Sequence, residues 1–242
     1  MFTVIHKDQL DSTNEEAKKL LSQGNILENT IIWAEDQSAG RGQQGNVWHN
    51  AKGKNLTFSL VWHPENIFPS EQFYISKAIS LGILTCLDEL SRDFSVKWPN
   101  DIYWKNKKVC GILIENTIHR QRIKYSVIGV GLNVNEIDFP DYLPQAVSIA
   151  EITEGLLNRQ GLLSRLMTAF DQMYLALNER DFKYLDKAYH ERLYLKDKKS
   201  QFQTGGQTLR GCIRGTMPDG RLILEPENGN LLLFDFKEIV FL

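Results

Sequence analysis

The residues whose types and spacing suggest chemistry begin with the segment GRGQQG at positions 40–45. Its glycine spacing is that of a dinucleotide-binding turn, but such a turn needs a helix that begins at the third glycine. The residues after Gly45, NVWHNAKGKN, are polar, contain another glycine and lead directly into a strand-like run. We therefore interpret the segment as a glycine-rich loop that closes over a ligand, with an ordinary surface loop as the alternative.

The groups in and beside this loop suit an anionic ligand that has an aromatic part. Gly40 and Gly42 allow the main chain to approach a ligand closely. Arg41 can hold a carboxylate or a phosphate through two parallel hydrogen bonds. Gln37 offers a hydrogen-bonding amide, and Trp48 offers a flat ring on which a base could stack.

A second group of candidate residues lies in the segment VKWPNDIYWKNKK. Asn100 and Asp101 are at the tip of a turn, and their oxygens suit a Mg²⁺ ion that rides on substrate phosphates. Lys97 and Lys108 could neutralise phosphate charge. Lys108 opens an apolar strand, which would fix its ammonium group, whereas the other two lysines of the KNKK turn read as solvated.

A third segment, VIGVGLNVN, combines a strand pattern with Gly131 and Asn133. Glycine inside a strand marks close approach of a ligand or of another part of the protein. The sequence leaves open whether a ligand approaches these glycines or whether another part of the protein packs on them.

The elements that must position these groups are strands and helices that alternate along the chain. Ser12 and Glu15, or Thr13 and Glu16, have capping-box spacing, which predicts a helix that Gly24 ends. The predicted strands cover 2–6, 29–35, 55–62, 108–116 and 124–135, and the longer predicted helices cover 70–93, 162–180 and about 182–193.

The pattern changes after about residue 195. Short β runs are separated by GG, PDG and ENGN, which are hairpin signals, so we expect a small β-barrel. The sequence therefore predicts two domains, a larger one over 1–194 and a smaller one over 195–242.

Composition excludes several other classes. The formal net charge of −2 gives no general attraction to nucleic acid. The chain contains no 18-residue apolar run and no signal-peptide pattern at its start, so we expect a cytoplasmic protein without membrane contact. Three isolated cysteines and five unclustered histidines argue against a disulfide framework and a zinc site.

Five motifs in order carry a family resemblance: STN at 12–14, GRGxxGxxW at 40–48, KWPND at 97–101, KxxGILIE at 108–115 and IGVGLNVN at 128–135. Together they closely resemble the bacterial biotin–protein ligases. Regulatory ligases carry an N-terminal helix-turn-helix, whereas this chain begins 11 residues before STN. We therefore expect the type without a DNA-binding domain, and no sequence-specific DNA binding.

The resemblance implies an α+β fold. The catalytic domain would be a mixed, mainly antiparallel sheet flanked by helices, similar to the core of the class II aminoacyl-tRNA synthetases. The C-terminal segment LRGCIRGTMPDGRLIL is similar to the small SH3-like β-barrel of the family.

The resemblance also implies a two-step reaction. Biotin and MgATP would give biotinyl-5′-AMP and pyrophosphate, and the biotinyl group would then pass to one lysine of a biotin carboxyl carrier domain of acetyl-CoA carboxylase or a related carboxylase. A sheet edge could pair with a second copy of the chain or with the carrier.

The motifs assign residues to roles by resemblance. The implied catalytic residues are Lys108, Arg41, Lys97 and Asp101. Asp101 is also implied as a ligand of the Mg²⁺ ion that accompanies ATP. The implied biotin-binding residues are Ser12, Thr13, Asn14, Gln37, Gly40, Arg41, Gly42, Gln43, Lys108 and Gly111. The implied ATP-binding residues are Trp48, Asn100, Asp101, Gly131 and Asn133.

One position departs from the family pattern. Many members have a second arginine where this chain has Gln43, which adds no positive charge. We expect weaker retention of biotinyl-AMP for that reason. Two alternatives stay open: a lipoate or octanoyl ligase on the same scaffold, and a non-catalytic binding protein, which would have lost Arg41 or Lys108.

Overall fold

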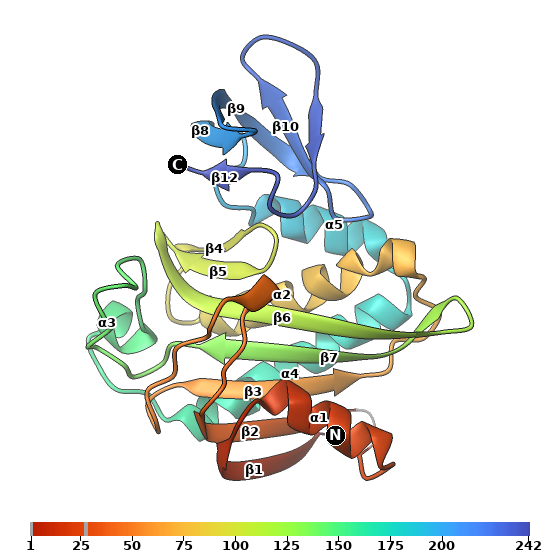
Figure 1. Cartoon of the computed structure of the whole chain (residues 1–242), viewed down its shortest axis with the longest axis vertical. Coiled ribbons are helices and arrows are strands. Elements are labelled where there is room, and N and C mark those ends of the chain that lie inside the picture. The colour runs from red at the N-terminus through yellow and green to blue at the C-terminus, as the bar shows by residue number, and fades with distance from the viewer. Residues whose placement is uncertain (1, 27–28) are drawn as a thin grey trace.

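The computed structural model describes residues 2–26 and 29–242, and its larger layer is a seven-stranded mixed sheet (Figure 1). The strand order is β1-β2-β3-β7-β6-β5-β4. β1 and β2 pair in parallel, and each other neighbouring pair is antiparallel. The strands are β1 (Thr3–Leu10), β2 (Thr30–Gln37), β3 (Leu56–Trp62), β4 (Phe94–Lys97), β5 (Asp101–Trp104), β6 (Lys107–His119) and β7 (Arg122–Leu132).

Helices cover both faces of this sheet. α1 (Thr13–Ser22) contacts β2, β3 and β7 on the face turned toward the viewer, and α2 (Phe73–Leu87) and α4 (Arg159–Asn178) pack together behind the sheet (Figure 1). α5 (Phe182–Glu191) packs against α2. The shorter helices are η1 (Gln43–Gly45), η2 (Pro69–Glu71) and α3 (Ile149–Thr153).

β3 is buried along its whole length because helices lie on both of its faces. Phe58 and Trp62 contact Phe170 of α4 behind the sheet. Their sequence neighbours point the opposite way, because side chains alternate along a strand. The alternate residues include Thr57 and Ser59, so the α1 face of the sheet presents polar groups at its centre.

A second, five-stranded sheet forms the C-terminal part of the chain, with antiparallel pairs in the order β11-β10-β9-β8-β12. It is attached to the first part by contacts such as the hydrogen bond from Trp98 Nε1 to the Gly220 carbonyl, 2.8 Å. The two end strands of this sheet, β11 and β12, are not paired with each other, so closure into an SH3-like barrel stays a prediction. The strands are β8 (Lys199–Thr204), β9 (Gln207–Thr216), β10 (Leu222–Pro226), β11 (Leu232–Phe234) and β12 (Val240–Phe241).

Several predicted elements differ from the observed ones. The helix expected over 70–93 is shorter, because η2 precedes it and α2 ends at Leu87. The expected capping box of α1 is wrong: Ser12 is the N-cap residue, but its side chain makes no capping hydrogen bond. Gly24 does follow α1 in a left-handed conformation, with φ of 71°. Among the described residues, no helix is both long and apolar enough to cross a membrane.

Candidate active site

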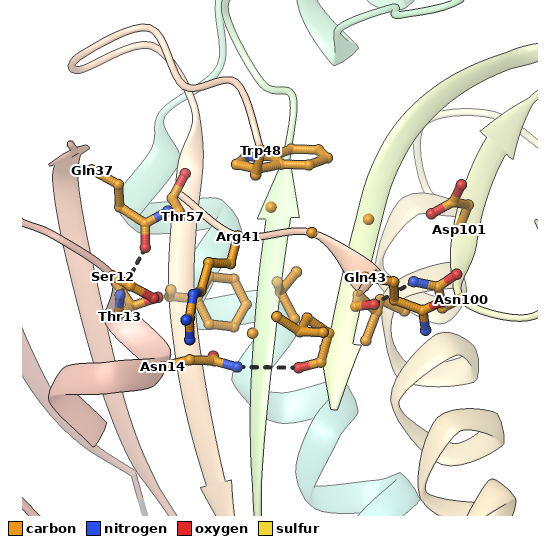
Figure 2. A pocket seen from close by; sticks show the side chains of 18 of the residues that line it. Ser12, Thr13, Asn14, Gln37, Arg41, Gln43, Trp48, Thr57, Asn100 and Asp101 are labelled. Carbon is orange, nitrogen blue, oxygen red and sulfur yellow. Dashed lines mark hydrogen bonds between the residues drawn. The ribbon is translucent and has the colours of Figure 1, made fainter. Parts of the chain in front are cut away.

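The α1 face of the sheet carries three strand glycines on which other side chains rest. Gly111 of β6 and Gly131 of β7 are direct cross-strand partners. A Cβ atom at Gly131 would lie 2.1 Å from Trp48 Cε2, and one at Gly129 would lie 2.5 Å from Asn14 Oδ1. The predicted close approach at these glycines is therefore made by Trp48 and Asn14, which lie directly on the sheet (Figure 2).

A cavity of about 480 Å³, part of it open to solvent, lies over this part of the sheet. Arg41 from the glycine-rich loop and Lys108 from β6 both line it, although they are far apart in sequence. The predicted site residues that line the cavity are Ser12, Thr13, Asn14, Gln37, Arg41, Gly42, Gln43, Trp48, Asn100, Asp101, Lys108, Gly111 and Gly131.

The start of α1 is held rigidly at one end of the cavity, where Ser12 and its two successors are buried. The Thr13 backbone N–H donates to Gln37 Oε1 at 2.7 Å, and Ser59 Oγ donates to Thr13 Oγ1 at 2.7 Å. Asn14 Nδ2 donates to Glu115 Oε2 at 2.8 Å. These polar groups are oriented by the protein alone, so a ligand would meet a preformed set of donors and acceptors.

The glycine-rich loop folds back on itself as a short hairpin. The Trp48 N–H donates to the Gly40 carbonyl at 3.0 Å, and the Gly42 N–H donates to the Asn46 carbonyl at 2.7 Å. A Cβ atom at Gly40 would lie 2.6 Å from the Trp48 carbonyl oxygen, so this closure requires glycine. Gly40 does not line the cavity, and its predicted contact with the ligand has no counterpart here.

Arg41 lies at the rim of the cavity. Its side chain is 58% exposed and forms an ion pair with Glu15, which is 47% exposed. An exposed ion pair contributes little stability, so the guanidinium can exchange this carboxylate for that of a ligand at small cost.

Lys108 and Asp101 form an ion pair on the opposite side of the cavity, with 2.8 Å between Nζ and Oδ1. Asp101 is the cross-strand partner of Gly111, which fixes its backbone in the β5–β6 ladder. Asn100 is fixed by its Nδ2, which donates to the Ile112 carbonyl at 2.5 Å. This side of the cavity therefore carries one preset cation and one preset carboxylate.

Lys97, by contrast, does not line this cavity. Its ammonium donates to the Tyr103 hydroxyl at 3.0 Å and lies 5.2 Å from the centre of the Phe241 ring in β12. Burial lowers the pKa of Lys97. Lys97 is the cross-strand partner of Asp101, but its ammonium is held at Tyr103, so a direct contact with phosphates stays a prediction.

A second cavity of about 840 Å³ lies beyond Trp48 and shares Trp48 and Lys108 with the first. Its other walls include Tyr103, Phe139 and Asn133. Asn133 is 4% exposed, and its Nδ2 donates to the Val147 carbonyl at 3.2 Å. The predicted ATP-binding residues thus divide: Asn133 belongs to the second cavity, Asn100, Asp101 and Gly131 belong to the first, and Trp48 belongs to both.

The structure adds site residues that the sequence analysis did not assign. Glu115 accepts from Asn14 and also from Lys18 Nζ at 2.6 Å, and Ser59 holds the start of α1. Sequence features could have marked two of these as site residues: Glu115 ends the GILIE motif, and Ser59 is a polar residue within an apolar strand. Glu15, the partner of Arg41, is marked only by its place in the first turn of a helix.

Comparison with known proteins gives one family match and several similar proteins. Residues 7–133 match the Biotin/lipoate A/B protein ligase family. The chain is 29% identical over 232 residues to the bifunctional ligase/repressor BirA of Bacillus spizizenii, covering 93% of this chain and 70% of that protein. It is 26% identical over 229 residues to the biotin–[acetyl-CoA-carboxylase] ligase of Paracoccus denitrificans, covering 92% and 94%.

The fold has a counterpart among solved structures. The biotin protein ligase from Aquifex aeolicus, solved in complex with biotin and ATP, superposes with a TM-score of 0.83 and covers 99% of this chain and 98% of that chain. The two sequences are 24% identical, so this likeness concerns the fold.

Proposed function

Since the chain belongs to the biotin/lipoate A/B protein ligase family, we propose that it is an ATP-dependent biotin–protein ligase, a biotin–[acetyl-CoA-carboxylase] ligase. The observation that carries the proposal is the meeting of Arg41 and Lys108 at one cavity, next to a second cavity that shares Lys108. Its substrates are biotin, MgATP and a lysine of a biotin carboxyl carrier domain.

We assign biotin to the first cavity and the nucleotide to the second. The ring system of biotin would contact the polar groups at the start of α1, and its carboxylate would reach Arg41 and Lys108. The base of ATP would lie against Trp48 on the far side, among the aromatic walls of the second cavity. The shared residue Lys108 is then near both the carboxylate and the α-phosphate.

The chemistry follows from charge. A biotin carboxylate oxygen attacks the α-phosphorus of ATP, the bond to the β-phosphate oxygen breaks, and pyrophosphate leaves. The two reactants are both anions, so they repel one another until positive charge lies between them. Arg41 and Lys108 supply such charge at fixed positions, and fixed positioning of reactants accounts for much of the barrier reduction in phosphoryl transfer.

In the second step, the amine of the carrier lysine attacks the carbonyl carbon of biotinyl-AMP, and AMP leaves as the amide forms. The mixed anhydride must be kept from water in the interval. The hairpin of residues 40–48 is supported by its own backbone hydrogen bonds and lies over the cavity, so it is suited to exclude solvent.

Asp101 suits a Mg²⁺ ion that arrives with ATP. Such an ion usually keeps several waters and takes one or two protein carboxylates along with the phosphates. Asp101 is one carboxylate beside Lys108, and among residues 2–26 and 29–242 no group of three or more His, Cys, Asp or Glu side chains is arranged to hold a metal ion. Magnesium is therefore assigned as part of the MgATP substrate.

We keep the division of the chain at 1–194 and 195–242 as part of this proposal, and the smaller part as the SH3-like module of the family. Two separate sheets support the division. The carrier domain is assigned as partner because relatives such as the Paracoccus denitrificans protein are named as biotin–[acetyl-CoA-carboxylase] ligases.

The test is exchange of radiolabelled pyrophosphate into ATP, with biotin or lipoate as the acid. Biotin should drive exchange and lipoate should not; the reverse result would favour the lipoate ligase alternative. Lys108→Ala removes charged hydrogen bonds worth about 1.5–3 kcal/mol each, and should slow exchange roughly ten- to a hundredfold. Lys107→Ala, which changes the neighbouring exposed lysine, serves as the control. Transfer of biotin to a purified carrier domain tests the second step.

A further inference from the structure

A histidine–carboxylate pair connects the glycine-rich loop to the segment that follows β7. His49, the residue after Trp48, donates from Nε2 to Glu136 Oε1 at 2.7 Å. Glu136 is 5% exposed, and its second oxygen accepts from Asn55 Nδ2 at 2.6 Å. Each carboxylate oxygen of this buried side chain thus has one donor.

The glutamate side of this pair is rigid. Asn55 is 1% exposed, and its Oδ1 accepts from the Val134 N–H at 3.0 Å, so the amide is held on both of its ends. The backbone is also joined here, because the Asn135 N–H donates to the Lys54 carbonyl at 3.0 Å. Glu136 is therefore a fixed acceptor.

The histidine side is more accessible. The His49 side chain is 27% exposed, and its Nδ1 lies 3.4 Å from the hydroxyl of Tyr142, which is itself 72% exposed. A neutral imidazole with its proton on Nε2 makes both contacts, since it donates to Glu136 and accepts from Tyr142. The more exposed His49 is therefore the member of the pair that can move, whereas Glu136 is held by Asn55.

We propose that His49 and Glu136 form a latch that holds the loop of residues 40–49 closed and so positions Trp48 between the two cavities. Trp48 lies on Gly131 and lines both cavities, and His49 and Tyr142 are further walls of the second one. The pair touches no reacting atom, so these are positioning residues. The expected effect of the latch on ATP binding rests on the proposed function, whereas its expected effect on the loop does not.

Opening the latch has two consequences. The loop then depends on its internal hydrogen bonds, so the Trp48 amide should open to solvent more often. The wall of the nucleotide cavity also loses its fixed position, so ATP should bind less well. A carboxylate hydrogen bond of this kind is worth enough to change such an equilibrium about tenfold.

The test compares His49→Ala with His49→Gln, whose side-chain amide can still donate to Glu136. Hydrogen exchange of the Trp48 and Gly42 amides is measured in the ligand-free protein, and the KM for ATP is measured by biotin-dependent pyrophosphate exchange. His6→Ala is the matched control, because His6 makes the same kind of contact with Glu35, at 2.8 Å, and lines neither cavity.

In His49→Ala we expect about tenfold faster amide exchange and about a tenfold higher KM for ATP, while the unfolding equilibrium in urea shifts by no more than that same factor. We expect near-complete rescue in His49→Gln and no effect of His6→Ala on the Trp48 amide or on the KM for ATP. Unchanged Trp48 exchange in His49→Ala, or a Gln variant no better than the Ala variant, would overturn the latch. Wild-type protein without biotin-dependent exchange would instead overturn the proposed function, and the amide exchange, which needs no substrate, would still decide the latch.

Discussion

Two glycines of β7 face the site from positions two residues apart, and their replacement by alanine tests whether the site is divided as we describe. A methyl group at Gly131 would lie 2.1–2.5 Å from three atoms of the Trp48 indole, whereas ordinary contact begins near 3.4 Å. The strand cannot give way easily, because Gly131 pairs with Thr57 on one side and Gly111 on the other. The indole must therefore withdraw by about 1 Å, a displacement that can cost about a hundredfold in rate.

Gly129→Ala is the companion change. Its methyl group would lie 2.5 Å from Asn14 Oδ1 and would move the amide at the biotin end of the site instead. We therefore expect Gly131→Ala to lower kcat/KM for ATP about a hundredfold, with a smaller effect on biotin binding in the absence of ATP. Gly129→Ala should weaken biotin binding first. Overpacking at either position also costs about 1–3 kcal/mol of stability, which urea unfolding measures separately.

The assays are calorimetric titration of biotin and steady-state pyrophosphate exchange at varied ATP. Gly155→Ala is the control, since a Cβ atom there has its nearest neighbour at 4.0 Å and should change neither quantity. If both β7 variants lose biotin and ATP affinity by equal factors, or if Gly131→Ala leaves kcat/KM for ATP unchanged, the division of the site at Trp48 is wrong.

Three further predictions concern charge. Gln43→Arg adds a cation at the rim of the first cavity and should slow release of biotinyl-AMP roughly tenfold; equal dissociation rates in quenched single-turnover reactions would contradict this. Burial lowers the pKa of His190 below its ordinary value of 6.5, and its Nε2 accepts from the Thr216 N–H at 3.0 Å. The unfolded chain then binds the proton more tightly, so the free energy of unfolding should fall between about pH 7 and pH 5, and His190→Gln should flatten that dependence in urea titrations. Asp186→Ala removes the carboxylate partner of the Lys77 ammonium, and the Lys77 side chain has no exposed surface. The free energy of unfolding, measured in urea, should fall by about 3 kcal/mol. A fall of less than about 1 kcal/mol, as for a surface ion pair, would refute that account.

Most of the residues that the motifs singled out line one cavity, but Gly40 and Lys97 do not. Arg41 and Lys108 line one cavity as the resemblance implied. Lys97 belongs to the same short motif as Asn100 and Asp101, yet its ammonium turns toward Tyr103 and away from the first cavity. Adjacency in sequence could not reveal this, because Phe241, which covers the ammonium, comes from the other end of the chain.

The strand glycines show the same limit. Their place inside strands indicated that something approaches the sheet there. The sequence left open whether a ligand or the protein itself does so, and the structure brings Trp48 to Gly131 and Asn14 to Gly129. An approach across a sheet depends on where a distant loop and helix lie, which no local spacing contains.

The sequence by itself therefore determined the local elements, the order of the motifs and the types of charge available for chemistry. These depend on alternation along strands, helical spacing and turn residues, all of which act within about ten positions of the chain. Only the tertiary structure decided the division into two cavities and the contact between His49 and Glu136. Such contacts join residues that are far apart in sequence, so they exist only once the whole sheet has formed and buried its core.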